Sequence, residues 1–170
     1  SNSATAPGPA AANVKLPSLT AAVNILAPFW SDLDLAGGAA GTGEMYVDIL
    51  TLSGKDYIVV EWNGVEEFDV PGVKYSFQVW IAADGSEDSF FNYLDVAGTP
   101  TALTVGAQDV SRTLGGSTYF STPAVAATGT LPAGSTAVDV NTVVGGKVDV
   151  KYTMQLDGDL DLGVADSLST

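Results

Sequence analysis

Between residues 44 and 96 apolar and polar side chains alternate with a period of two, and short turns interrupt the pattern. This alternation predicts β-strands, because successive side chains of an extended strand face opposite sides of a sheet. The connections are about 3 to 10 residues long, too short for parallel crossovers, so we expect an antiparallel meander. The predicted strands are EMYVDILTL (44–52), DYIVVEWN (56–63), VKYSFQVWIA (73–82) and DSFFNYLDV (88–96).

Glycines mark two of the predicted turns. Gly54 follows Ser53, and Gly85 follows Asp84, which is a strong hairpin signal because glycine accepts a positive φ without steric cost. The carboxylates of Asp84, Glu87 and Asp88 are expected to be solvated at the tip of the second hairpin.

The second half of the chain is rich in Gly, Thr, Ser and Ala and contains weaker strand patterns, at residues 101–107, 117–122 and 136–141. The last strand, in GKVDVKYTMQLDG from residue 146, alternates clearly between an apolar and a polar face. A sheet with one apolar face needs a second layer, and few helical segments are available to supply it. We therefore predict an all-β fold, an antiparallel two-sheet β-sandwich of jelly-roll-like type, with a small barrel as the alternative.

The charge of the chain excludes several functions. There are 20 Asp and Glu residues against 6 Lys and Arg residues, so the net charge is -14, and the cations are scattered. Nucleic acids and anionic membranes require a cationic patch, so neither is an expected partner. No apolar run approaches the roughly 20 residues that cross a bilayer, so no membrane insertion is expected.

Cysteine and histidine are both absent from the chain. Disulfides, thiolate metal sites, Ser-His-Asp catalysis and His-containing zinc sites are therefore excluded, together with the usual general base near neutral pH. We expect no catalytic residues and no cofactor, with calcium as the one candidate ion.

The composition divides the chain into three parts. Residues 1–14, which open with SNSATAPGPAAA, are predicted to be a linker or tag remnant. Residues 15–157 are predicted to form a single β-sandwich domain, and residues 158–170 an acidic C-terminal tail. We expect the segment to come from a longer polypeptide.

The stretch APFWSDLDL contains the first candidate metal ligands, Asp32 and Asp34. Their spacing places both carboxylates on one strand face or around a cation in a loop, and the glycine-rich AGGAAGTG that follows offers backbone carbonyls. The interpretation we favour is structural: Asp32 caps a turn, Asp34 faces water, and the aromatics anchor a sheet edge.

A second candidate calcium loop lies near the C-terminus, where Asp157, Asp159 and Asp161 form a D-x-D-x-D pattern with glycines. The pattern lacks the glutamate expected at the twelfth position, which is Leu168. We favour an exposed acidic tail.

The candidate ligand-binding residues are Trp80, Gln78, Glu61, Asn63 and Asn92. Trp80 lies opposite the apolar face of its strand and beside an amide, and an aromatic ring flanked by amides and carboxylates on an open sheet suits stacking on a sugar. The alternative is that Trp80 is buried beneath a loop or beneath the second half of the chain.

Six phrases in order, LAPFWSDLDL, GEMYVDIL, YIVVEWNGVEEF, KYSFQVWIAADGSEDSFFNYLDV, TALTVGAQD and GGSTYF, resemble an accessory β domain of secreted bacterial subtilisin-like serine peptidases. The opening part is similar, more distantly, to nidogen-type extracellular domains, whose pattern also begins with an APFW phrase followed by aspartates. The resemblance covers residues 15–122.

The resemblance implies a secreted or cell-surface location in bacteria and a non-catalytic role that aids substrate contact, surface contact or the stability of the parent chain. The chain lacks the His-Gly-Thr-His and Gly-Thr-Ser-Met phrases of the catalytic domains. The expected partners are neighbouring domains of a longer chain and a protein or polysaccharide substrate. The alternative function is a carbohydrate-binding or calcium-stabilised adhesin-like module.

Overall fold

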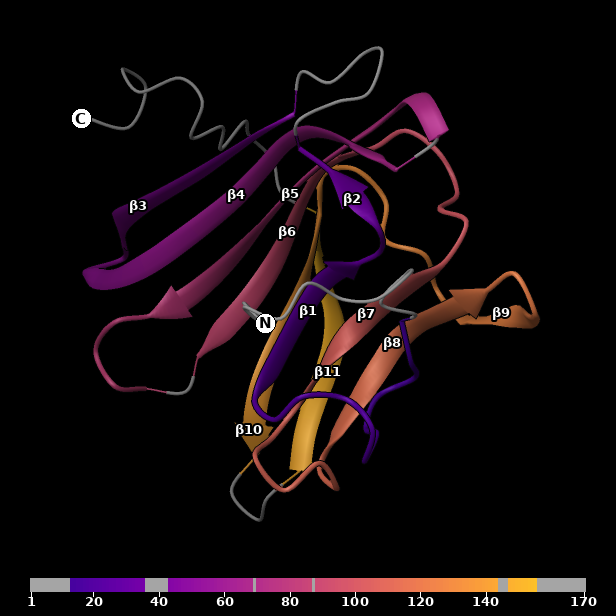
Figure 1. The fold of residues 1–170 in the computed structure, drawn as a ribbon. Helices are drawn as coiled ribbons and strands as arrows, with labels where there is room; N and C mark the ends of the chain where they lie inside the picture. Colours follow the sequence, from indigo (N-terminus) through magenta and orange to yellow (C-terminus); the bar gives the residue numbers. More distant parts are fainter. Residues whose placement is uncertain (1–12, 36–42, 69, 87, 144–146, 156–170) are drawn as a thin grey trace.

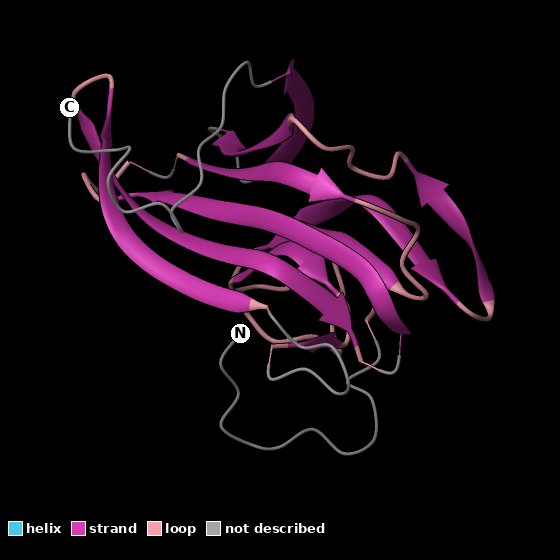
Figure 2. Cartoon of the chain, turned by 90° about the horizontal axis from the view of Figure 1, so that it is seen from above, coloured by secondary structure: helices cyan, strands magenta, loops and turns pink. Residues whose placement is uncertain are grey.

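The computed structural model describes residues 13–35, 43–68, 70–86, 88–143 and 147–155, and the side chains up to residue 140. These residues form strands and turns without a helix (Figure 2), so none of them belongs to a helix that would span a membrane. The strands are β1 (Ile25–Trp30), β2 (Leu33–Asp34), β3 (Glu44–Leu52), β4 (Lys55–Glu67), β5 (Val70–Ala82), β6 (Ser89–Val96), β7 (Leu103–Gln108), β8 (Gly115–Thr122), β9 (Val125–Gly129), β10 (Thr136–Val143) and β11 (Lys147–Gln155).

The strands form two antiparallel sheets that pack face to face (Figure 1). The larger sheet has the order β11-β10-β6-β5-β4-β2, and β3 also pairs with β4; the smaller sheet has the order β1-β7-β8-β9. Strand β1 lies against β5, and β11 lies against β7 and β8. The sheets do not close into a barrel, so the predicted two-sheet sandwich is confirmed and the barrel alternative is wrong.

The predicted meander is strands β3 to β6, each paired with its neighbour in sequence. Ser53, Gly54 and Gly85 have positive φ angles of 52°, 79° and 81°, as the turn chemistry predicts. The weaker predicted strands correspond to β7, β8 and β10, and the last one to β11. Strand β9 was not predicted, because its sequence VAATG carries no clear alternation.

The two sheets meet at a stack of aromatic rings. Phe29 of β1 is buried and lies with its ring centre 5.0 Å from that of Phe77 and 4.7 Å from that of Tyr75. Trp62 of β4 stacks on the same Phe77 at 5.0 Å. Offset stacking at these distances adds to the stability that burial supplies. The APFW phrase is therefore a strand that inserts its Phe29 ring into the core.

A hydrogen bond also joins the sheets. The hydroxyl of Tyr93, on β6, donates to the carbonyl oxygen of Pro28, on β1, at 2.6 Å. Both residues are buried, so the carbonyl has no access to bulk water in place of this donor.

Residues 13–24 cover the outer face of the smaller sheet. Asn13 is buried and donates through Nδ2 to Thr104 Oγ1 (3.0 Å) and to the carbonyl oxygen of Ser121 (2.9 Å). Gln108 accepts from the amide of Ser18 at 2.8 Å. Asn13 is therefore packed against the smaller sheet, although it lies within residues 1–14, the segment predicted to be a linker or tag remnant.

Replacing Tyr93 by Phe is expected to lower the free energy of unfolding by about 1–3 kcal/mol, because the buried Pro28 carbonyl loses its donor. Urea denaturation measures the change, with an unchanged m-value. The matched control is Tyr46→Phe. The Tyr46 hydroxyl bonds to Glu44 at an exposed site, so its removal is expected to change the free energy of unfolding by less than about 0.5 kcal/mol. Equal effects of the two substitutions would contradict the assigned role of Tyr93.

Candidate functional site

Three polar side chains form a row across the larger sheet. In the strand register Glu61 of β4 lies opposite Gln78 of β5, and Gln78 lies opposite Asn92 of β6. Gln78 Nε2 donates to Glu61 Oε2 at 2.7 Å, and Asn92 Nδ2 lies 3.5 Å from Gln78 Oε1. None of the three is more than 1 % exposed. The polar patch predicted from the sequence is thus assembled, but it is buried.

Trp80 completes this network from the same face of β5. Its Nε1 donates to Gln78 Oε1 at 2.8 Å, and its ring stacks on Phe90 at 5.2 Å with Tyr57 edge-on at 5.7 Å. Trp80 is 2 % exposed. Stacking on a sugar requires a free ring face, so the open surface expected for carbohydrate binding is not present in this conformation. Trp80 is therefore buried, and the rings that contact it are Tyr57 of β4 and Phe90 of β6.

Asn63, the fifth predicted residue, lies beside the row. It occupies the irregularity in β4 between Trp62 and Val65, and its Oδ1 accepts from Ser76 Oγ at 3.4 Å. The Ser76 hydroxyl also accepts from the amide of Gly64 at 2.9 Å. These bonds hold the irregular segment of β4 against β5.

The network of Glu61, Gln78, Asn92 and Trp80 supplies a carboxylate, two amides and an indole N–H. These groups hydrogen-bond to one another, and the Glu61 carboxylate is buried away from solvent. Asn92 Oδ1 is buried and has no hydrogen-bond partner among the described residues. Because cross-strand polar pairs must keep their register to stay bonded, the network fixes the alignment of three central strands.

The chain crosses from the smaller to the larger sheet at Ser31 and Asp32, between β1 and β2. The Asp32 side chain is exposed, and its backbone oxygen accepts from the amide of Phe68 at 2.8 Å. Asp34 is half-buried in β2, opposite Glu66. Within the described ranges no three Asp or Glu side chains are grouped to hold a metal ion. The calcium role of Asp32 and Asp34 stays a prediction.

The second predicted calcium loop, Asp157, Asp159 and Asp161, lies outside the described residues.

Glu67 is a buried carboxylate that sequence reasoning missed. It is 6 % exposed and accepts from Ser31 Oγ (2.6 Å), from the amide of Thr101 (2.9 Å) and from Thr101 Oγ1 (3.2 Å). These bonds join the crossing between the sheets to the segment before β7. In the sequence, GVEEFDVPG has the appearance of a solvated loop, and a single serine 36 residues earlier gives no signal of pairing.

The phenol of Tyr75 lies in the core near this carboxylate. Burial raises the pKa of Tyr75 to about 12, and the negative charge of Glu67 acts in the same direction. Both causes disfavour the phenolate.

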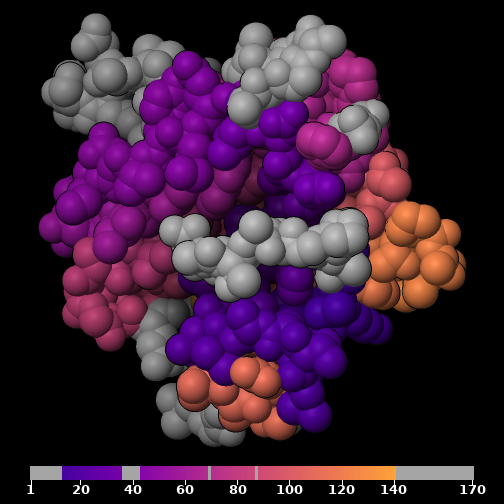
Figure 3. Space-filling view, viewed as in Figure 1, coloured from indigo at the N-terminus to yellow at the C-terminus, as the bar shows by residue number. Residues whose placement is uncertain are grey.

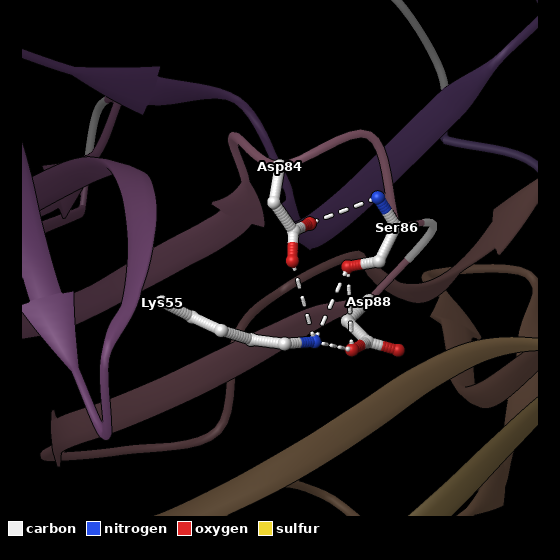
Figure 4. A network of polar contacts seen from close by, with 4 residues as sticks. All are labelled: Lys55, Asp84, Ser86 and Asp88. Atoms are coloured by element: carbon white, nitrogen blue, oxygen red, sulfur yellow. Dashed lines mark hydrogen bonds and ion pairs between the residues drawn. The ribbon is translucent and has the colours of Figure 1, made fainter.

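Lys55 links the start of β4 to the turn between β5 and β6 (Figure 4). Its Nζ lies 2.6 Å from Asp88 and 3.6 Å from Asp84, and the amide of Ser86 donates to Asp84 at 2.8 Å. The hydrogen bond to Asp88 raises the pKa of Lys55, and the Ser86 bonds lower the pKa of Asp84. A nucleophilic amine needs a lowered pKa, so this cluster is an ion-paired hairpin tip.

A family model described as NIDO related matches residues 2–151, which is 150 of the 170 residues. No curated protein and no solved structure matches the chain. The matched range includes β1 to β10 and the first part of β11, so it covers strands of both sheets.

Replacing Gln78 by Met is expected to lower the free energy of unfolding by about 2–4 kcal/mol, because the indole N–H of Trp80 and the carboxylate of Glu61 each lose a buried partner. A double-mutant cycle with Trp80→Phe, which removes the indole N–H, should give a coupling energy of about 0.5–3 kcal/mol. Additive effects of the two substitutions would show that the bond contributes nothing.

The raised pKa of Tyr75 makes stability depend on alkaline pH. The unfolded phenol titrates near 10 and the folded one near 12, so its contribution is complete below pH 10 and is lost as the pH rises to about 12. The loss is about 3 kcal/mol at most. Urea denaturation of the wild type and of Tyr75→Phe isolates it, because the variant lacks this pH dependence.

Glu67→Gln should lower the titration midpoint of Tyr75, because the amide carries no negative charge. Ultraviolet titration of the tyrosines follows the midpoint, with the exposed Glu44→Gln as the matched control. An equal midpoint in both variants would remove the electrostatic link between Glu67 and Tyr75.

Proposed function

The chain belongs to the NIDO-related family, and we propose that it is a non-catalytic extracellular module that assists a secreted bacterial subtilisin-like peptidase. Domains of this family are extracellular-type modules without catalytic function. The membership confirms the nidogen-type resemblance of the opening phrases.

The observation that carries the non-catalytic role is the mutual bonding of the buried polar groups. Gln78 donates to Glu61 Oε2 and accepts from the indole N–H of Trp80. The sequence has neither histidine nor cysteine, and the one described lysine cluster is ion-paired with its pKa raised. General acid–base chemistry requires a titrating group within reach of a substrate, and the described network offers none.

The link to a peptidase rests on the six phrases that resemble the accessory domain, all of which supply strands of the sandwich. A sandwich with a continuous core is a rigid module that holds its loops and edges in fixed positions next to a neighbouring domain. Its net charge of -14 keeps it from adhering to anionic surfaces. The module therefore aids substrate contact, surface contact or stability of a longer polypeptide.

Two measurements test this function. Antibodies raised against the chain should capture, from the culture medium, a longer polypeptide in which mass spectrometry finds a subtilisin-like catalytic domain. The purified chain alone should release no peptides from casein. Capture of a polypeptide without a peptidase domain would remove the accessory role, and peptide release by the pure chain would remove the non-catalytic one.

A further inference from the structure

Strand β3 is a long and regular edge of the larger sheet. Its nine residues pair with β4 from Glu44 opposite Asn63 to Leu52 opposite Lys55 without a register shift. Among the described strands β4 is its one partner, and β2 meets the same edge of β4 farther along. Exposed edges are usually protected by proline, lysine or a bulge. Strand β3 has none of these, and no other strand of the described residues pairs with its outer edge.

One face of β3 is apolar and exposed. Met45, Val47 and Ile49 are 51 %, 62 % and 65 % exposed, and Ile58 next to them on β4 is 41 % exposed. This is the face that the larger sheet turns toward the core, but the smaller sheet ends at β1, which lies against β5. In Figure 3 the violet atoms of β3 and β4 lie at the left border of the molecule. The larger sheet thus extends beyond the layer that would cover it.

The backbone of β3 is oriented for pairing. The amide of Ile49 donates to its neighbour Asp48 Oδ1 at 2.7 Å, which places this amide on the side away from β4. Because backbone groups alternate in direction along a strand, those of Val47 and Met45 face the same open side. The backbone groups of Met45 and Val47 therefore face the outer edge, where the Asp48 carboxylate accepts from the amide of Ile49.

The charges near the outer edge of β3 determine which kind of strand can pair with it. Glu44 and Asp48 are exposed on the other face of β3. A second copy would bring the same carboxylates and a further charge of -14 to the edge. Like charges on facing strands are destabilising, whereas a lysine or arginine opposite each carboxylate is stabilising. The edge is thus complementary to a basic strand and not to itself.

We propose that the free edge of β3 binds an extended basic segment of another protein, which adds an antiparallel strand to the larger sheet. The segment has one residue opposite each β3 residue from Ile49 back to Glu44. In that order, its six residues are apolar, basic, apolar, any residue, apolar and basic. This inference is independent of the proposed accessory function, because it rests on the edge alone.

The test uses a fluorescent peptide, Val-Lys-Val-Thr-Val-Lys between short Gly-Ser flanks, and fluorescence anisotropy at low and high salt. Two control peptides have glutamate in place of lysine, or the same residues with the alternation broken. The lysine peptide should bind, more weakly at high salt, and both controls should bind at least about tenfold more weakly.

Protein variants locate the site. Val47→Lys should weaken binding at least about tenfold, since it removes apolar surface and repels the peptide. The matched control is Val125→Lys, where the valine is 48 % exposed. Its strand β9 belongs to the orange segment at the opposite border of the molecule (Figure 3), so binding should be unchanged. Asp48→Asn should weaken binding and reduce its salt dependence. Thermal unfolding verifies that each variant is folded, and Val47→Thr replaces Val47→Lys if the lysine variant is not.

Two results would overturn the proposal. Equal binding of the peptide with broken alternation, or equal losses from Val47→Lys and Val125→Lys, would mean attraction by net charge alone. A dimer in analytical ultracentrifugation that Val47→Lys dissociates would assign the edge to a second copy of the chain.

Discussion

The structure depends on the burial of both faces of the larger sheet around Glu61, Gln78 and Asn92. One face packs Phe77 and Trp62 against Phe29 of the smaller sheet, and the other holds Trp80 with its polar neighbours. A strand that is buried on both sides must satisfy every polar side chain within the protein. Gln78 bonds to Glu61 across the strands and to Trp80 along its own strand, which helps to accommodate an acidic, amide-rich row inside a sandwich.

Much of this fold follows from the alternation between residues 44 and 96, since a period of two fixes both the strands and the face of each side chain. The faces of Phe77 and Trp80 are assigned correctly by parity alone. Burial of the face that holds Trp80 is not predicted, because alternation shows on which side of a sheet a residue lies and not what covers that side. The buried Glu67 was missed for a related reason: its partners Ser31 and Thr101 are distant in sequence and chemically ordinary.

The candidate ligand site and the edge of β3 differ in how they are exposed in the structure. The candidate ligand site, defined by Trp80 and its neighbours, is closed by its own bonds and by ring contacts. The edge at Met45, Val47 and Ile49 is open, although in sequence it looks like any core-facing strand. Its exposure arises because the smaller sheet ends at β1, a property of the whole sandwich that local patterns do not contain.

The central claim, that the polar row is a closed part of the core, is tested most directly by hydrogen exchange of the indole N–H groups, followed by nuclear magnetic resonance. Trp30 and Trp62 are half-buried, whereas Trp80 is 2 % exposed and bonded to Gln78. The Trp80 indole proton is expected to exchange only through global unfolding, far more slowly than the other two. Fast exchange of all three indole protons in the folded protein would contradict it.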